Sequence, residues 1–504
     1  NTDSARFADI IRGQRFPDRN SLRAVFAFLR NFTVFMHDII KYHAGHIGPA
    51  FRFNSSEGIN VNKTYYIQTY GCQMNENDSE KLAGMLRQIG WTPAEKAEES
   101  GLIIVNTCSV RENADDRAFG NIGKFKTYKR KNPDMILAVC GCMMQQPEIV
   151  AELRQKHPQV DIIFGTHNLH RFPQILGNFI AAGEQITEIW DESDAVVEDI
   201  PVENKYPFKA YVTIMQGCNN FCSYCIVPYT RGREHSRQPE RILDEIRGLA
   251  DRGVIEVTLL GQNVNSYGND LEIGIDFATL LRQVNEIDGI RRIRFMTSNP
   301  KDFTDDVIAA MAQCEKVMPS CHLAMQSGST RVIRRMNRHY TKEEAIALVR
   351  RIRDEVPGAV ITTDIIVGFP GETEEDFQDT LDLVRACRFD SAFSFIYSKR
   401  HGTPAAEMED QIPDEIKHDR LNRLLEVLHT VSAQINAPFQ DQTVDVLVEG
   451  PSARDASRLT GRTAGGKLVN FTGNFDDIGR IVPVRIDKAG TFSLTGVQTA
   501  AEAD

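Results

Sequence analysis

The sequence has 504 residues, ten cysteines and a formal net charge of −11 at pH 7. One hydrophobic core rarely supports a chain of this length, so we expect about three domains. Apolar residues make up 41% of the chain, but no apolar run reaches the roughly 18 residues of a membrane helix, so we expect no membrane span. The negative charge argues against indiscriminate binding to nucleic acid, although a local basic patch would suffice for one RNA partner.

Residues 1–60 predict an N-terminal extension with one helix at about residues 21–43. The apolar part of this segment contains Arg23, Arg30 and Asp38, which a signal peptide would not carry. Ten cysteines in so long a chain do not form a disulfide scaffold, which favours metal binding or catalysis. We therefore expect a cytoplasmic protein.

Residues 61–200 alternate between buried strands and helices. Four apolar runs read as strands that are buried on both faces: YYIQT, LIIVN, MILAVC and DIIF. Helical stretches such as NDSEKLAGMLRQIG lie between them. The segment predicts an α/β domain with a parallel sheet, followed by the acidic linker DESDAVVEDIPVENKYP.

A second alternating series fills residues 206–440. Its six expected strands are KAYVTIM, VIEVTLL, RRIRFMT, HLAMQ, VITTDIIVG and SAFSFIY. Six strands with helices between them predict a partial (β/α)6 barrel, and a long helix follows at about residues 413–436. Residues 441–504 contain five short strands, which predict a small antiparallel β-barrel of a kind that often binds nucleic acid. The fold class is therefore α/β with a small C-terminal β-barrel.

The segment GCNNFCSYCIVPYTRGR, residues 217–233, has the spacing C-x3-C-x2-C directly after the first expected barrel strand. Cys218, Cys222 and Cys225 would lie at the carboxyl mouth of the barrel, where barrel enzymes keep their chemistry. Three thiolates can hold three irons of a 4Fe–4S cluster. The fourth iron would be open to a molecule with an amino and a carboxylate group, such as S-adenosylmethionine (SAM). Two other interpretations stay open: three structural thiols, or a zinc site completed by His235.

Three more cysteines are far apart in the sequence. Cys72 in TYGCQMN, Cys108 in NTCSV and Cys142 in VCGCMMQ each follow an expected parallel strand. Such strand ends share one edge of a sheet, so the thiols could converge on a second cluster; the alternative is three unrelated cysteines. Cys140 could be a fourth ligand, but we expect it to point into the core, with Cys142 on an exposed loop. The remaining cysteines are expected to be buried thiols: Cys314, Cys321 and Cys387.

Nine segments together resemble the tRNA methylthiotransferases of the MiaB type, within the radical SAM superfamily. They are TYGCQMN, NTCSVREN, GCMMQ, GTHNLHRFP, GCNNFCSYCIVPYTRGR, GQNVNSYG, RFMTSNP, MQSGS and DIIVGFPGETEEDF. In that superfamily an aromatic residue precedes the last cysteine of the loop, and Tyr224 stands there. The resemblance runs from about Lys63 to the C-terminus. It departs from the family at His235, where arginine is frequent, and at His401, where proline is.

The resemblance implies a methylthiotransferase domain, a radical SAM domain and a C-terminal TRAM domain that contacts RNA. It implies an auxiliary and a SAM-binding 4Fe–4S cluster, whose ligands are respectively Cys72, Cys108 and Cys142, and Cys218, Cys222 and Cys225. The implied reaction adds a methylthio group to carbon 2 of N6-isopentenyladenosine beside the anticodon of tRNA. A 5′-deoxyadenosyl radical from SAM would remove the hydrogen, and the second cluster would hold the sulfur. The enzyme would be a monomer that takes electrons from a donor such as flavodoxin or ferredoxin.

Further contacts are predicted from strand ends and from charge. Candidate SAM contacts at expected strand ends, each equally able to be a structural turn residue, are Asn263, Ser298, Gln326 and Asp364. Tyr224 of the cysteine loop is a further candidate SAM contact. Cations cluster in KFKTYKRK, RGREHSR and RVIRRMNR, and Arg231 and Arg233 are candidate RNA contacts. The target base would enter a barrel mouth that both other domains face, with an apolar pocket for its isopentenyl group.

Two other functions stay open on the sequence. One is a methylthiotransferase for the threonylcarbamoyl adenosine of tRNA or for an aspartate of a ribosomal protein. The other is a zinc-binding RNA-binding protein without catalysis. The segment YGCQMN resembles the isopentenyladenosine group, which favours the reaction given above.

Overall fold

The computed structural model describes residues 61–109, 112–192 and 196–500, the side chains of 112–116 excepted. The predicted extension 1–60 and its helix lie outside these residues, as do the last four residues of the segment 441–504. The described elements belong to one compact unit. No helix in the described part of the chain is both long and apolar enough to cross a bilayer.

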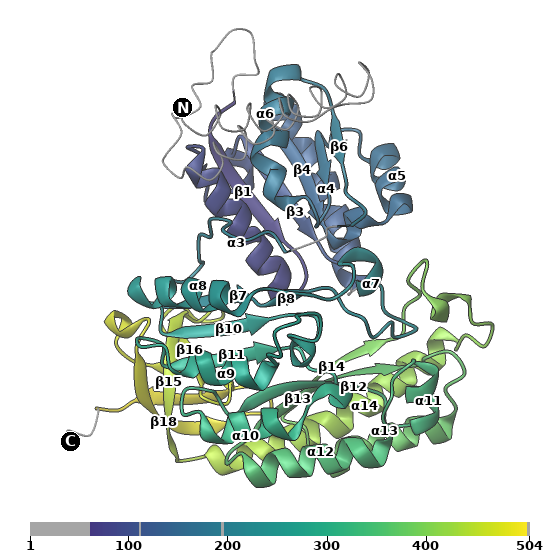
Figure 1. Ribbon diagram of the computed structural model, residues 1–504, viewed down its shortest axis with the longest axis vertical. Coiled ribbons are helices and arrows are strands. Elements are labelled where there is room, and N and C mark those ends of the chain that lie inside the picture. The colour runs from purple at the N-terminus through teal and green to yellow at the C-terminus, as the bar shows by residue number, and fades with distance from the viewer. Residues whose placement is uncertain (1–60, 110–111, 193–195, 501–504) are drawn as a thin grey trace, which may run out of the picture. The chain divides into compact units, whose positions relative to one another are not determined.

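The first part is a parallel sheet, as predicted, and it has six strands, two more than the four expected (Figure 1). Its strands, in the order β2-β1-β3-β4-β5-β6, are β1 (Thr64–Thr69), β2 (Thr92–Pro93), β3 (Leu102–Thr107), β4 (Ile136–Gly141), β5 (Ile162–Phe164) and β6 (Ile186–Glu188). Its helices are α3 (Gln73–Gln88), α4 (Glu112–Lys131), α5 (Pro147–Lys156) and α6 (Phe172–Ala182). Leu102 and Ile104 of β3 pack with α3 and α6, whereas Ile103 and Val105 pack with α4. Helices therefore cover both faces, which explains why the strands are continuous apolar runs.

Six parallel strands form the predicted partial barrel as two sheets, β11-β10-β7 and β12-β13-β14. The strands are β7 (Lys209–Thr213), β10 (Glu256–Leu260), β11 (Arg292–Met296), β12 (Ser320–Gln326), β13 (Val360–Val367) and β14 (Ser391–Ile396). The helices are α8 (Pro239–Asp251), α9 (Phe277–Asn285), α10 (Asp305–Gln313), α11 (Thr330–Arg335), α12 (Lys342–Glu355), α13 (Glu374–Cys387) and α14 (Asp414–Asn436). A single bridge between Ser298 and Leu323 helps to join the two sheets.

Strand β13 separates the inside of this barrel from its outer core. Ile361 and Ile365 are buried in the core shared with the outer helices. Successive side chains of a strand point to opposite faces, so Thr362, Asp364 and Ile366 face the inside. All three of these inward residues keep some exposure.

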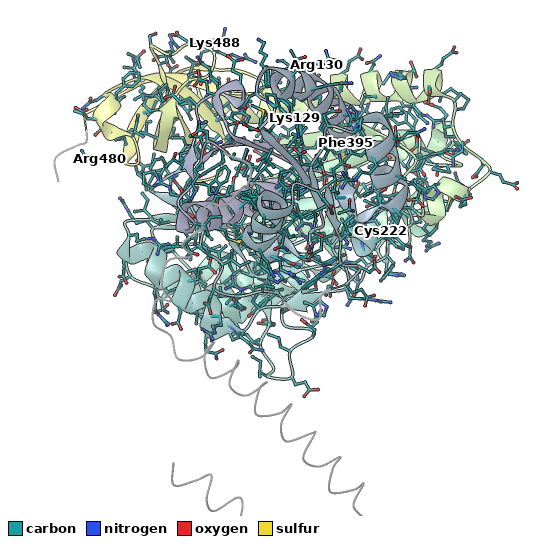
Figure 2. The ribbon with its side chains drawn as sticks, turned by 90° about the horizontal axis from the view of Figure 1, so that it is seen from above. Lys129, Arg130, Cys222, Phe395, Arg480 and Lys488 are labelled. Carbon is teal, nitrogen blue, oxygen red and sulfur yellow. The ribbon has the colours of Figure 1, made fainter. Side chains whose placement is uncertain are left out.

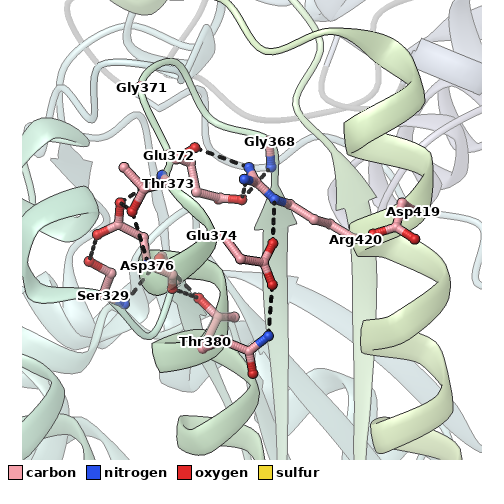
Figure 3. A network of polar contacts seen from close by, with 12 residues as sticks. Ser329, Gly368, Gly371, Glu372, Thr373, Glu374, Asp376, Thr380, Asp419 and Arg420 are labelled. Carbon is pink, nitrogen blue, oxygen red and sulfur yellow. Dashed lines mark hydrogen bonds and ion pairs between the residues drawn. The ribbon is translucent and has the colours of Figure 1, made fainter.

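The turn between β13 and α13 is held by a polar network (Figure 3). Gly371 takes a φ of 72°, a region that favours glycine. Thr373 and Asp376 then form a capping box, in which each side chain accepts a hydrogen bond from the other's backbone N–H. Beside this box, Glu372 accepts a 2.9 Å hydrogen bond from Arg420 of α14. These contacts fix the start of α13 against the long helix.

The C-terminal part is a closed barrel of five strands in the order β15-β16-β17-β19-β18. The strands are β15 (Thr443–Pro451), β16 (Leu459–Thr463), β17 (Leu468–Thr472), β18 (Ile481–Ala489) and β19 (Leu494–Gln498). The small barrel is as predicted, but β17 and β19 run parallel, so it is not wholly antiparallel. Five strands cannot alternate in direction all the way around a closed ring, and one parallel pair is the consequence.

The C-terminal barrel packs against the amino-terminal ends of the central strands. Lys209, the first residue of β7, forms a 2.5 Å ion pair with Glu449 of β15. Arg292, the first residue of β11, donates to a backbone carbonyl of β16. Asp390, directly before β14, pairs with Lys467 at 2.6 Å. The expectation that both other domains face the barrel mouth is therefore wrong, because parallel strands all begin at the end opposite their mouth.

Candidate active site

The cysteines at positions 72, 108 and 142, called the sheet set below, follow three neighbouring strands. Cys72 follows β1, Cys108 follows β3 and Cys142 follows β4, and these strands lie side by side in the sheet. Gly71 makes the close approach possible: a Cβ atom there would lie 2.6 Å from Cys108 Cβ and 2.9 Å from its Sγ. The sheet order thus brings three thiols to one edge, where open α/β folds bind ligands.

Buried amides fix the backbone around the sheet set. Asn75 Nδ2 donates to Asn106 Oδ1 at 3.1 Å and to the Thr107 carbonyl at 2.8 Å. Asn106 Nδ2 in turn donates to the Asn75 carbonyl at 2.9 Å. Cys72 Sγ lies 3.5 Å from Asn75 Oδ1. Sequence reasoning missed this network; its signal is an asparagine three residues after one cysteine and another two residues before the next.

Cys140 and Cys142 differ less in exposure than expected. Cys140 is fully buried in the core beside β3, as expected for the last apolar position of β4. Cys142 is also buried, with 6% exposed, so its expected place on an exposed loop is wrong. Helix α7 (Val227–Thr230) packs against the turn that Cys142 begins, which covers the thiol. The predicted buried thiols are confirmed at Cys314, Cys321 and Cys387.

The cysteines at positions 218, 222 and 225, called the loop set below, follow β7 and the short strand β8 (Met215–Gln216). Local backbone bonds hold them: Cys218 N–H donates to the Gly232 carbonyl, and Cys225 N–H donates to that of Cys222. Burial raises the pKa of Cys218 to about 11 and, together with Cys222, that of Cys225 to about 12. These two thiols are therefore protonated at neutral pH until a metal displaces their protons.

A buried arginine that sequence reasoning placed among the surface cations lies beside the loop set. Arg338 Nη1 is 3.5 Å from Cys222 Sγ and 3.4 Å from the Tyr224 hydroxyl. Its other nitrogens bond to the Tyr340 hydroxyl and to Asn299 Oδ1, both at 3.0 Å. Arg338 therefore anchors the loop at Cys222 and Tyr224, and it is not an RNA contact in this arrangement.

The sheet set faces the mouth of the barrel. Gln73, next to Cys72, donates to Met296 Sδ at the end of β11. Thr213, the last residue of β7, donates to Asn77 Oδ1 at 2.8 Å. Helix α3 lies along this boundary with β7 and β8 in Figure 1. The carboxyl ends of the six-stranded sheet and of the barrel sheet β11-β10-β7 thus meet, and both cysteine sets lie on that side.

The four candidate SAM contacts at strand ends differ in whether their side chains already have a partner. Asn263 is used to hold the next turn, because its side-chain amide donates to Asp302 and accepts from the Asn299 N–H, both after β11. Ser298 is different: its Oγ is buried and has no hydrogen-bond partner among the described residues. Gln326 takes a φ of 69° at the end of β12, and Asp364 pairs with His322 Nε2 at 3.1 Å inside the barrel. Ser298 is therefore the candidate best suited to a small polar ligand at the mouth.

The two candidate RNA contacts are placed differently. Arg231 is buried, with its guanidinium on Cys142 and Asp78, so a surface role in RNA binding is not available to it. Arg233 is exposed, and its guanidinium lies 4.6 Å from the centre of the Phe221 ring within the loop. Other cations of the basic runs form ion pairs instead, namely Lys129, Arg237, Arg331 and Arg335. Sequence patterns alone do not separate these paired cations from an exposed one.

The donor atoms of both sets bear on the zinc alternative. Within the described residues, no three Cys, His, Asp or Glu side chains meet in a geometry that would hold one metal ion. His235 lies on β9 (His235–Ser236), opposite Gln216. In a 4Fe–4S cluster each thiolate binds its own iron, which needs wider spacing than a single-ion site. Each set offers three thiols, the ligand type that iron–sulfur clusters use.

Three family models match separate parts of the chain. The model described as "Uncharacterized protein family UPF0004" matches residues 64–165, the Radical SAM superfamily model matches residues 212–384, and the TRAM domain model matches residues 439–498. Among solved structures, the cobalamin-bound radical SAM methyltransferase TsrM from Kitasatospora setae is similar with a TM-score of 0.50 and 16% identity. That match covers 69% of this chain and 77% of TsrM, and it shows the fold alone. The protein is a radical SAM enzyme with a TRAM domain.

Curated relatives are much closer in sequence. The tRNA-2-methylthio-N(6)-dimethylallyladenosine synthase of Clostridium novyi is 55% identical over 443 residues, which covers 88% of this chain and 98% of the relative. The enzyme of the same name from Clostridioides difficile is 55% identical over 436 residues, covering 86% and 91%. The chain belongs to the tRNA-2-methylthio-N(6)-dimethylallyladenosine synthase family.

Proposed function

We propose that this protein adds a methylthio group to carbon 2 of N6-isopentenyladenosine beside the anticodon of tRNA. The relatives that support this reaction carry it in their name. One observation in the structure carries the proposal: two sets of three cysteines lie on facing carboxyl edges of two parallel sheets. The reaction needs two chemical tasks at one base, removal of a hydrogen and delivery of sulfur. The alternative substrates have no such support.

Membership of the radical SAM superfamily implies a 4Fe–4S cluster and SAM. We assign that cluster to the loop set and propose a second 4Fe–4S cluster on the sheet set. When bound, the first supplies the electron for radical cleavage of SAM and the second supplies an iron site for sulfur. The protein's own part is to hold both: each set provides three thiolates, and the buried Ser298 Oγ lies free to bond a polar group of SAM.

The inner face of β14 offers a place for the base. Phe393 and Phe395 lie opposite Asp364 and Ile366 of β13 in the strand register, so they share the inward face. Phe393 is 46% exposed, and β14 is the edge strand of its sheet. Aromatic rings can stack on a flipped base, and apolar surface can receive an isopentenyl group. Figure 2 marks Phe395 together with Cys222 of the loop set.

The roles of the three segments and the remaining partners follow from the same function. Segments 61–200, 206–440 and 441–504 would act as methylthiotransferase, radical SAM and TRAM domains. The exposed Arg233 would contact a phosphate near the target base. Electrons would come from a small donor such as flavodoxin or ferredoxin, and the enzyme would work as a monomer in the cytoplasm.

The test is an anaerobic assay with three anticodon stem-loops that carry unmodified, isopentenylated or threonylcarbamoylated adenosine. The methylthio product is measured by mass spectrometry. We expect product from the isopentenylated RNA and little from the unmodified one, since burying five carbons is worth roughly 2–4 kcal/mol. Product from only the threonylcarbamoylated RNA would overturn the assignment of isopentenyladenosine as the substrate. A Phe395→Ala variant should reduce the preference for the isopentenylated RNA over the unmodified RNA. The matched control is Phe475→Ala, which changes an exposed phenylalanine of the C-terminal part and should leave that preference unchanged.

A further inference from the structure

Arg231 joins the two cysteine sets physically. It follows α7, six residues after Cys225 of the loop set. Its Nε lies 3.1 Å from Cys142 Sγ of the sheet set, and its Nη2 lies 2.6 Å from Asp78 Oδ2 of α3. The side chains of Arg231 and Asp78 are only 4% and 5% exposed. One guanidinium thus reaches from the end of one cysteine loop to a thiol of the other set.

Burying the charge of Arg231 costs free energy. Its contacts with Asp78 and Cys142 must therefore be held in one geometry. A buried charge is tolerated only when it is paired and its donors are satisfied. The planar fork of arginine can bond to two acceptors at once with fixed directions, which an ammonium cannot do. Asp78 balances the charge and orients the fork, and the remaining Nε–H then points at sulfur. A purely structural ion pair would need the carboxylate but not the thiol.

Neighbouring bonds keep the same boundary closed. Thr166 Oγ1 donates to the Thr230 carbonyl at 2.8 Å, directly before Arg231. Thr213 and Asn77 bond across the boundary on the β7 side. Arg231 therefore acts within a hydrogen-bonded seam and is the member of that seam that touches a cysteine.

We propose that Arg231 is a positioning residue that holds the Cys142 thiol and thereby sets the sheet set at a fixed place relative to the loop set. The role rests on the proposed function in one respect, namely that Cys142 binds the second cluster. The physical contact itself does not depend on that cluster. Two measurements therefore separate the inference from the function.

The first measurement is hydrogen–deuterium exchange on the full-length protein without clusters. Arg231→Met keeps the length of the side chain but removes its charge and fork. Amides of residues 142–146 should then exchange about tenfold faster or more, which corresponds to about 1.4 kcal/mol of lost protection. Arg231→Lys should lie between wild type and Arg231→Met, because one ammonium cannot serve both acceptors in the same geometry.

The matched control is Arg420→Met. Arg420 is also buried and forms a 2.9 Å pair with a buried carboxylate, Glu372, but neither residue belongs to the seam. This variant should leave exchange at residues 142–146 unchanged. Equal exchange there in wild type and Arg231→Met would overturn the proposal, and so would an equal acceleration by Arg420→Met.

The second measurement is iron content with electron paramagnetic resonance after anaerobic reconstitution. Arg231→Met should lower the occupancy of the sheet-set cluster, or alter its signal, and should leave the loop-set signal in place. If wild type held only one cluster, the proposed second cluster would fall, while the exchange result would still decide whether Arg231 holds Cys142. If both clusters formed in Arg231→Met with wild-type signals, the positioning role would be wrong.

Discussion

The loop set and the sheet set each offer three thiols but are held by different parts of the structure. Cys218 and Cys225 are fixed by backbone bonds within a single loop. The sheet set depends on the order β1-β3-β4 and on the close approach of Gly71 to Cys108. Cysteines a few residues apart stay near one another even when packing loosens, because the connecting chain is short. A site gathered from three strands has no such protection, so the two sets should respond differently to mutation.

Cys222→Ala should have the largest effect. It removes one of three thiolates at the loop set, so SAM cleavage, measured as 5′-deoxyadenosine, should fall to background. Cys321→Ala is the matched control, since Cys321 is a buried thiol of the same barrel away from its mouth. That control should keep SAM cleavage. If Cys222→Ala still cleaved SAM, the loop set would not hold the cluster that cleaves it.

Cys108→Ala tests the role of the sheet set. It should stop the methylthio product while 5′-deoxyadenosine is still formed, because the loop set does not use this thiol. Liquid chromatography with mass spectrometry can follow both products in one reaction. Loss of both products in a protein that still folds, judged by circular dichroism, would argue against separate roles for the two sets.

Cys140→Ser should have a smaller effect that falls on stability. Cys140 is fully buried in an apolar core, where an unpaired hydroxyl costs about 1–3 kcal/mol. Urea unfolding should show this loss, whereas the iron content after reconstitution should match that of wild type. An iron loss as large as that of Cys142→Ser would make Cys140 a ligand of the sheet set.

The buried pair of Glu372 and Arg420 provides a reference that touches neither set. Burial raises the pKa of Glu372 from its ordinary 4.5 to about 7. The folded state therefore binds this proton more readily than the unfolded state does. The stability from this group is full below pH 4.5 and is lost as the pH rises to about 7, by about 3 kcal/mol at most.

Urea titrations of wild type and Glu372→Gln between pH 4.5 and 8 measure this contribution. The variant should show a flatter dependence of stability on pH than wild type does, with both clusters retained. Parallel curves for the two proteins would show that Glu372 does not titrate in this range.

Much of the fold was predictable because its signals are local. Apolar strands with helices between them predicted the parallel sheet of the first part and the partial barrel, and turn-separated short strands predicted the small C-terminal barrel. The parallel pair of β17 and β19 was not predicted, since it follows from closing an odd number of strands. The docking of the C-terminal barrel was missed as well, because it depends on ion pairs such as Lys209 with Glu449, 240 residues apart.

The site was predictable to the extent that strand ends are. Cysteines directly after strands were expected to meet, and the sheet order brings them together. The arginines were not predictable, because a run of cations does not reveal which of its members find a buried partner. Arg231 and Arg338 lie in two such runs, yet each contacts a cysteine, of the sheet set and the loop set respectively. Their acceptors come from distant elements and appear only in the folded chain.

We propose that the two sets hold two separate clusters. Anaerobic reconstitution of the full-length protein, followed by counts of iron and sulfide per chain, tests it most directly. We expect about eight irons and about eight sulfides in wild type, and about four of each in both Cys222→Ala and Cys108→Ala. About four irons in wild type, unchanged in Cys108→Ala, would contradict it.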